Sequence, residues 1–151
     1  MKALRALAAM AAMHAGIAAA ATYQVDDSLS LPNESSANMK WRSLAPSRQA
    51  GNALDGSSIV TVRLKVAPWT NRNAKIYLAL PEQPIGTVTA AWSTQGKLLP
   101  GELVSGNRTL VYAGVIRAPM IEDTIVLKLT ADGRRMTADQ RLQFHFEIDV
   151  D

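Results

Sequence analysis

The chain has 151 residues, with 16 Lys and Arg, 13 Asp and Glu, and no cysteine. This length is enough for one domain with its own core, and the lack of cysteine excludes both a disulfide framework and a thiolate metal centre. Without Lys2 and Arg5, which belong to a leader-like start, 14 basic residues face 13 acidic ones. This near-neutral balance argues against a nucleic-acid-binding protein.

Residues 1–21 have the pattern of a secretory signal peptide. Lys2 and Arg5 precede an apolar run from Ala6 to Ile17, which is followed by small residues. The run is short for a membrane anchor and contains His14. We therefore predict export, with cleavage after Ala20 or Ala21.

Residues 22–31, TYQVDDSLSL, alternate between apolar and polar side chains. One face of a strand here would present Tyr23, Val25, Asp27, Leu29 and Leu31, with Asp27 interrupting the apolar stripe. Pro32 ends the segment. Residues 33–58 are rich in Ser, Asn, Ala, Gly and Pro, and within them only 39–44, around Trp41, is predicted as a strand.

From Ile59 onward the strand pattern is stronger. Alternation predicts strands over 59–66, 75–80, 86–92, 109–115 and 123–131, with 98–104 as a loop or a short edge strand. The side chains expected to point inward are Val60, Val62, Leu64, Val66, Ile76, Leu78, Leu80, Val88, Ala90, Trp92, Ile125, Leu127 and Leu129. Turn residues separate these segments at short intervals, which predicts an all-β fold, an antiparallel β-sandwich, with a barrel as the alternative.

The final segment, RLQFHFEIDVD (141–151), alternates without a fault. Its apolar face has Leu142, Phe144, Phe146, Ile148 and Val150, and its polar face has Gln143, His145, Glu147 and Asp149. No residue follows Asp151 to pair with such a strand, so the sequence leaves open what covers its edge.

No group of residues predicts catalysis, a metal site or a cofactor. His145 is the only histidine after residue 21, it lies on a polar strand face, and no Gly-x-Ser-x-Gly motif accompanies it. The adjacent carboxylates Asp26 and Asp27 lack the ligand spacing of a calcium loop, as do Asp149 and Asp151. Trp69, in a turn, is the one candidate for an exposed sugar-binding aromatic. We expect no enzyme activity.

Three segments resemble the chaperone–usher fimbrial pilins, and most closely the alpha class that contains the enterotoxigenic colonisation-factor pilins. These segments are VTVRLKVAPWTNRNAKIYLAL (60–80), VTAAWSTQGKLL (88–99) and TADQRLQFHFEIDV (137–150). The resemblance implies an immunoglobulin-like sandwich that lacks its last strand and is completed by a donor strand. It divides the chain into a signal peptide (1–21), a donor-strand extension (22–32) and a sandwich domain (33–151).

The resemblance also implies a function and partners. The chain would be a structural subunit of a cell-surface fimbria that supports adhesion, polymerised by donor-strand exchange with identical or related pilin subunits. A periplasmic chaperone and an outer-membrane usher would assist, and a host receptor is a further partner. The donor strand would present Tyr23, Val25, Asp27, Leu29 and Leu31 to a groove edged by the apolar face of 141–151.

Two alternatives stay open at this stage. Residues 22–31 could pair within their own domain as an ordinary first strand. The protein could also be a monomeric exported β-sandwich that binds carbohydrate or serves the cell envelope.

Overall fold

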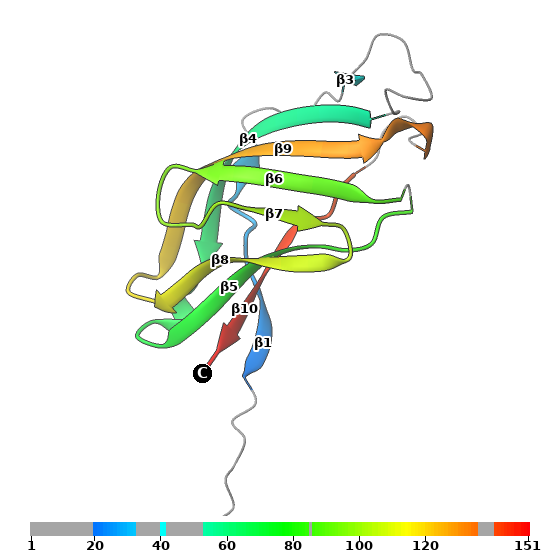
Figure 1. Ribbon diagram of the computed structural model, residues 1–151. Helices are drawn as coiled ribbons and strands as arrows, with labels where there is room; N and C mark the ends of the chain where they lie inside the picture. The colour runs from blue at the N-terminus through cyan, green and yellow to red at the C-terminus, as the bar shows by residue number, and fades with distance from the viewer. Residues whose placement is uncertain (1–19, 33–39, 42–52, 85, 136–140) are drawn as a thin grey trace, which may run out of the picture.

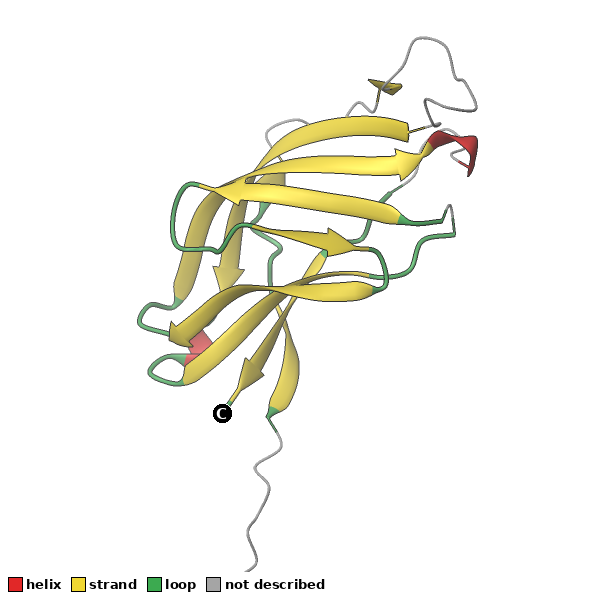
Figure 2. Cartoon of the chain, viewed as in Figure 1, coloured by secondary structure: helices red, strands yellow, loops and turns green. Residues whose placement is uncertain are grey.

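The computed structural model describes residues 20–32, 40–41, 53–84, 86–135 and 141–151. The predicted signal peptide, most of 33–52 and the 136–140 segment lie outside these ranges, as does the side chain of Trp41. The described residues form ten strands, two 3₁₀ turns (Ala67–Trp69 and Gly133–Arg135) and no α-helix (Figure 2). The strands are β1 (Ala21–Val25), β2 (Leu31–Pro32), β3 (Lys40–Trp41), β4 (Ala53–Lys65), β5 (Asn73–Leu80), β6 (Val88–Thr94), β7 (Gly101–Val104), β8 (Asn107–Val115), β9 (Met120–Asp132) and β10 (His145–Val150).

The strands make two antiparallel sheets, as the alternating sequence predicts. One sheet has four strands in the order β1-β10-β5-β8, and we call it sheet A. The other, sheet B, has the order β2-β4-β9-β6-β7, with β3 also paired to β4. The two sheets lie face to face, and β1 enters sheet A beside the C-terminal strand (Figure 1). The predicted antiparallel β-sandwich is confirmed.

The core lies between the sheets and is built from the inward positions of the alternating strands. All the predicted inward residues are buried except Val60, which is half-buried against the core. On β10, Phe146, Ile148 and Val150 are buried, so the predicted faces of this strand are correct. Leu142 and Phe144 precede β10 and are half-buried against the core.

Two strand boundaries differ from the prediction. β4 begins at Ala53, inside a stretch read from sequence as irregular, because residues 53–58 pair with the end of the long strand β9. Residues 98–104 contain the short strand β7 at the edge of sheet B, one of the two forms predicted.

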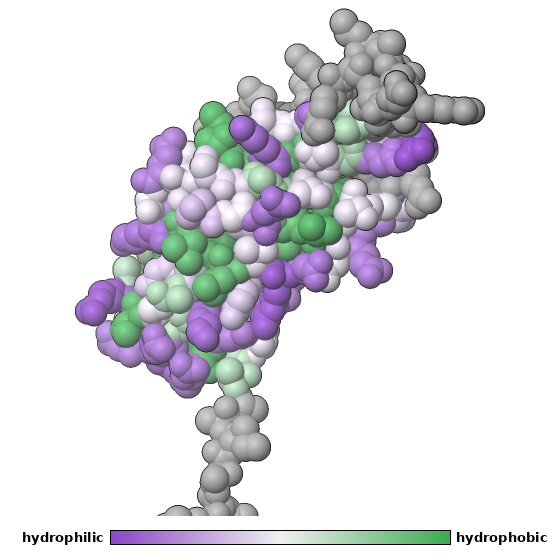
Figure 3. Space-filling view, in the orientation of Figure 1, coloured by the Kyte–Doolittle hydropathy of each residue, from purple (hydrophilic) through white to green (hydrophobic). Residues whose placement is uncertain are grey.

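On the face in Figure 3, hydrophobic residues form small patches separated by hydrophilic ones. Among the described residues, no helix is long and apolar enough to cross a bilayer.

Candidate functional site: the edge strand beside β10

The candidate site is the edge of sheet A, where β1 lies antiparallel to β10. Ala21 pairs with Val150, Tyr23 with Ile148, and Val25 with Phe146. The other side of β10 pairs with β5. The N-terminal strand therefore covers the edge of β10 that the sequence left open, and it does so within the same chain.

The position of β1 is unusual for a first strand. In an immunoglobulin-like sandwich one sheet has the strands A, B, E and D, and the other has C, F and G, with G the last in the chain. The order β2-β4-β9-β6 corresponds to A-B-E-D, and β1-β10-β5 corresponds to G-F-C. In this comparison β1 lies where the C-terminal strand G lies in an immunoglobulin domain, and β7 and β8 are additional edge strands without a counterpart among the seven.

The inner face of β1 is anchored mainly by one side chain. Val25 is only 1% exposed, whereas Tyr23 is 47% exposed. The Tyr23 ring lies 5.8 Å from the Trp69 ring, centroid to centroid, at an interplanar angle of 41°. Trp69 is half-buried against the core. It is therefore a packing residue under Tyr23, which agrees with the packing role that the sequence favoured over a sugar-binding one.

The outer face of β1 is linked to a polar network. Thr22 Oγ1 donates a hydrogen bond of 2.6 Å to Asp149 Oδ1. Arg108, on β8, donates from Nη2 to Asp149 at 3.0 Å and from Nη1 to Glu147 at 3.0 Å. The hydrogen bond from Thr22 and then those from Arg108 lower the pKa of Asp149, although desolvation opposes this. Thr22, Asp149, Arg108 and Glu147 form what we call the outer-face network.

The segment 22–31 is not one continuous strand, contrary to the prediction. After Val25 the chain leaves sheet A: Asp26 forms an ion pair with Lys65 of β4 at 2.9 Å, and a turn is closed by the Ser30 N–H donating to the Asp27 carbonyl. Hydrogen bonds from Ser28 and Lys65 hold the pKa of Asp26 well below its usual range. Partial burial raises the pKa of Asp27. The segment then joins sheet B as β2.

This turn leaves the second half of the predicted apolar stripe in solvent. Leu29 is 42% exposed and Leu31 is 58% exposed. Of the five residues predicted to face a groove, the folded chain fully buries only Val25. The apolar pattern of 22–31 is therefore only partly used when the segment packs on its own domain.

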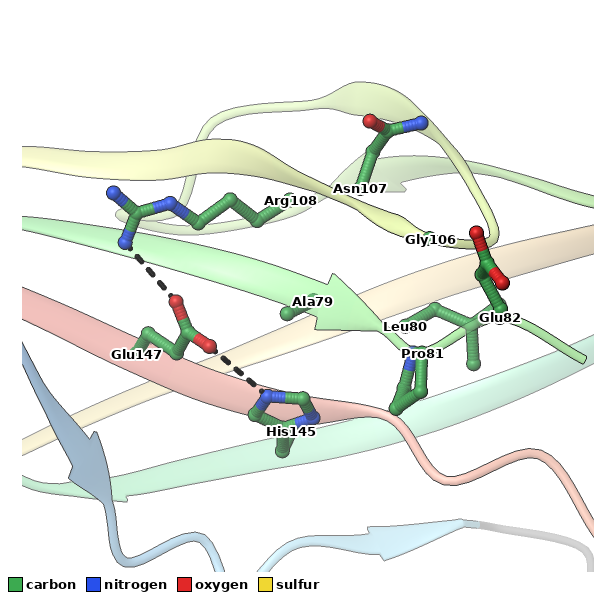
Figure 4. Close-up of a pocket in the computed structure, with 9 residues that line it drawn as sticks. All are labelled: Ala79, Leu80, Pro81, Glu82, Gly106, Asn107, Arg108, His145 and Glu147. Atoms are coloured by element: carbon green, nitrogen blue, oxygen red, sulfur yellow. Dashed lines mark hydrogen bonds and ion pairs between the residues drawn. The ribbon is translucent and has the colours of Figure 1, made fainter.

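An open depression of about 490 Å³ lies beside this edge, on the outer side of sheet A. Glu147 stands between Arg108 and His145 in it, and Asn107 and Glu82 lie toward its other end (Figure 4). His145 Nε2 lies 3.2 Å from Glu147 Oε1, and the His145 side chain is 29% exposed. His145 is thus partly buried and paired with Glu147, on the polar strand face that the sequence predicted.

No group of three or more His, Cys, Asp or Glu side chains in the described ranges could hold a metal ion. Searches of protein-family models, curated proteins and solved structures find no match to this chain. The described residues form an antiparallel β-sandwich in which β1 is the edge strand of sheet A.

Proposed function

We propose that the protein is a structural subunit of a bacterial surface fimbria and polymerises by donor-strand exchange. The main observation is that β1 occupies the last-strand position of the sandwich while most apolar side chains of 22–31 stay exposed. A strand that comes from the N-terminus can be supplied equally well by a second molecule, because its place depends on pairing with β10 and not on chain order.

Extending the register of β1 shows what exchange would add. Val25 pairs with Phe146, so the same register places Asp27 opposite Phe144 and Leu29 opposite Leu142. In the folded single chain, residues 141–144 are not in a strand, and Leu142 and Phe144 are half-buried. A straight donor strand would cover these side chains and remove Leu29 from water. Burial of apolar surface therefore favours exchange over self-pairing.

An unpaired β10 would also need protection before assembly. It would expose the backbone groups of an edge next to Phe146 and Ile148, and such edges aggregate. A periplasmic chaperone that supplies a temporary strand, and an outer-membrane usher that receives the subunit, fit this requirement. Export through the predicted signal peptide and adhesion as the role of the fibre belong to the same proposal.

Single-cysteine variants test the exchange, because the chain has no cysteine of its own. Mature Leu29→Cys and Leu142→Cys chains are unfolded together, refolded as a mixture and oxidised. Exchange predicts an intermolecular disulfide between these two positions, which mass spectrometry identifies. Leu99→Cys, which is exposed on a loop, replaces Leu29→Cys as the matched control. A disulfide no more frequent than in the control contradicts exchange.

A monomeric exported binding protein is the second candidate. The closure of the sandwich by its own β1, together with the depression lined by Asn107, Arg108 and Glu147, favours it. A mature chain that is monomeric at all concentrations and binds glycans through this depression would support this second function.

A further inference from the structure

We propose that the outer-face network fixes the register and the sequence specificity of the strand that pairs with β10. A role of this network in joining two molecules rests on the proposed function. The contacts themselves are those within the folded single chain. It assigns Thr22, Asp149 and Arg108 as specificity-determining residues on the solvent side, in addition to the apolar contacts on the core side.

The core side alone defines the register weakly. Side chains in a strand repeat every two residues, so a shift by two keeps every apolar side chain facing the core. Val25 would then lie opposite Ile148 instead of Phe146, and both of these residues are buried and apolar. Tyr23 and Ala21 are exposed, so on the inner face the shift costs mainly the contact between the Tyr23 and Trp69 rings.

The solvent side distinguishes these registers. In the observed register Thr22 is opposite Asp149, and its hydroxyl donates to the carboxylate at 2.6 Å. In the shift that places Val25 opposite Ile148, Gln24 lies opposite Asp149 and Thr22 moves to the end of the strand opposite Asp151, so the hydroxyl loses the Asp149 carboxylate that Arg108 holds. The opposite shift brings Ala20 to Asp149 and Thr22 to Glu147, so the network discriminates chiefly against the first shift. A hydrogen bond to an ionised acceptor is stronger than one between neutral groups. A shifted strand that lacks this bond is therefore less stable than the strand in the native register.

Arg108 keeps the Asp149 carboxylate in place for this contact. Its guanidinium lies over the Tyr77 ring, 4.2 Å from the centroid, and bonds to Glu147 as well as Asp149. The Asp149 side chain is only 16% exposed. The acceptor for Thr22 is therefore held by residues of β8 and β5, two strands that are not part of the edge strand.

The arrangement predicts which strands this edge accepts. The donor needs a Ser or Thr three residues before its fully buried apolar residue, as Thr22 precedes Val25. Segments from other subunits that lack this hydroxyl should pair less precisely with β10.

Cysteine pairs report the register directly, because a disulfide needs Cα atoms within about 7 Å. Ala21→Cys with Val150→Cys reports the native register, and Tyr23→Cys with Val150→Cys reports a shift by two. All chains have Lys65→Gln, which removes the ion pair with Asp26 as a second determinant of register. Thr22→Val is expected to raise the yield of the disulfide that reports the shifted register roughly three- to tenfold. Thr22→Ser keeps a hydroxyl and is expected to leave this yield at the wild-type level.

Thr109→Val is the matched control, because Thr109 lies in the same sheet and its hydroxyl donates to the Glu102 carbonyl. The inference is overturned if Thr22→Val leaves the shifted disulfide at background, if Thr22→Ser does not restore the native register, or if Thr109→Val has an equal effect. Non-reducing gels separate intramolecular from intermolecular disulfides. A response confined to intramolecular disulfides supports the register rule and counts against strand exchange.

Discussion

Val25→Ala tests how firmly β1 is attached to the sandwich. Val25 is 1% exposed and is the one fully buried side chain of β1. The substitution removes two methyl groups, worth about 1.6 kcal/mol by transfer, and the cavity left behind raises the cost to about 2–3 kcal/mol. Because β1 is an edge strand paired to β10 alone, the loss should appear first as local detachment.

The assay is amide hydrogen exchange of the mature protein, followed on peptides that cover residues 20–32. A loss of about 2 kcal/mol should speed the exchange of this segment roughly thirtyfold, with little change in β4 or β9. Leu31→Ala is the control, because Leu31 is 58% exposed, and it should change stability by less than about 0.5 kcal/mol. Equal effects of the two substitutions would refute the assignment of Val25 as the anchor.

Three further predictions follow from the same geometry. Phe146→Ala, at a buried position, should lower the free energy of unfolding by about 3–5 kcal/mol. His145→Ala, at a partly exposed position, should lower it by less than about 1 kcal/mol. If urea denaturation gives the reverse order, the faces of β10 are misassigned. Asp123→Ala should lower the free energy of unfolding by about 2–4 kcal/mol in the same assay, because the buried Asp123 carboxylate accepts hydrogen bonds from the backbone N–H groups of Leu98 and Thr124. An unchanged free energy of unfolding would mean that water takes over these hydrogen bonds. Asp27→Asn should stabilise the protein at pH 7, since burial raises the pKa of Asp27 and folding therefore disfavours its charge. The gain in stability should shrink as the pH falls toward about 4, where the carboxyl of the unfolded chain becomes protonated. A gain that does not change with pH would contradict this cause.

The sequence was sufficient to predict the sandwich and the faces of its strands. Alternation depends only on which side chains avoid water, so Leu64, Ile76 and Leu127 could be assigned to the core without any knowledge of their partners. The strand at 53–58 was missed because Gly56, Ser57 and Ser58 have weak strand propensity and become a strand only by pairing with β9.

The details of the candidate site depend on register, which alternation does not specify. Residues 22–31 looked like one strand, but the Asp26–Lys65 ion pair and the turn at 27–30 divide it in two. The outer-face network was missed for the same reason. Arg108, Asp149 and Thr22 lie far apart in the sequence and meet only once β8, β5, β10 and β1 are aligned. The sequence indicated only that Glu147 and Asp149 lie on the polar face of the last strand, and it did not indicate which residues they contact.

The central claim is that residues 22–31 join one molecule to the next, and Leu29→Asp tests it most directly. Leu29 is 42% exposed in the folded chain, so the change should leave the melting temperature of the monomer nearly unaltered. In an exchanged strand, the same residue would lie opposite the half-buried Leu142, and a charge there would oppose pairing. The measurement is the mass distribution of the mature chain by analytical ultracentrifugation after refolding at high concentration. Donor-strand exchange predicts multi-subunit species for the wild type and monomers for Leu29→Asp, whereas identical distributions for the two proteins would contradict it.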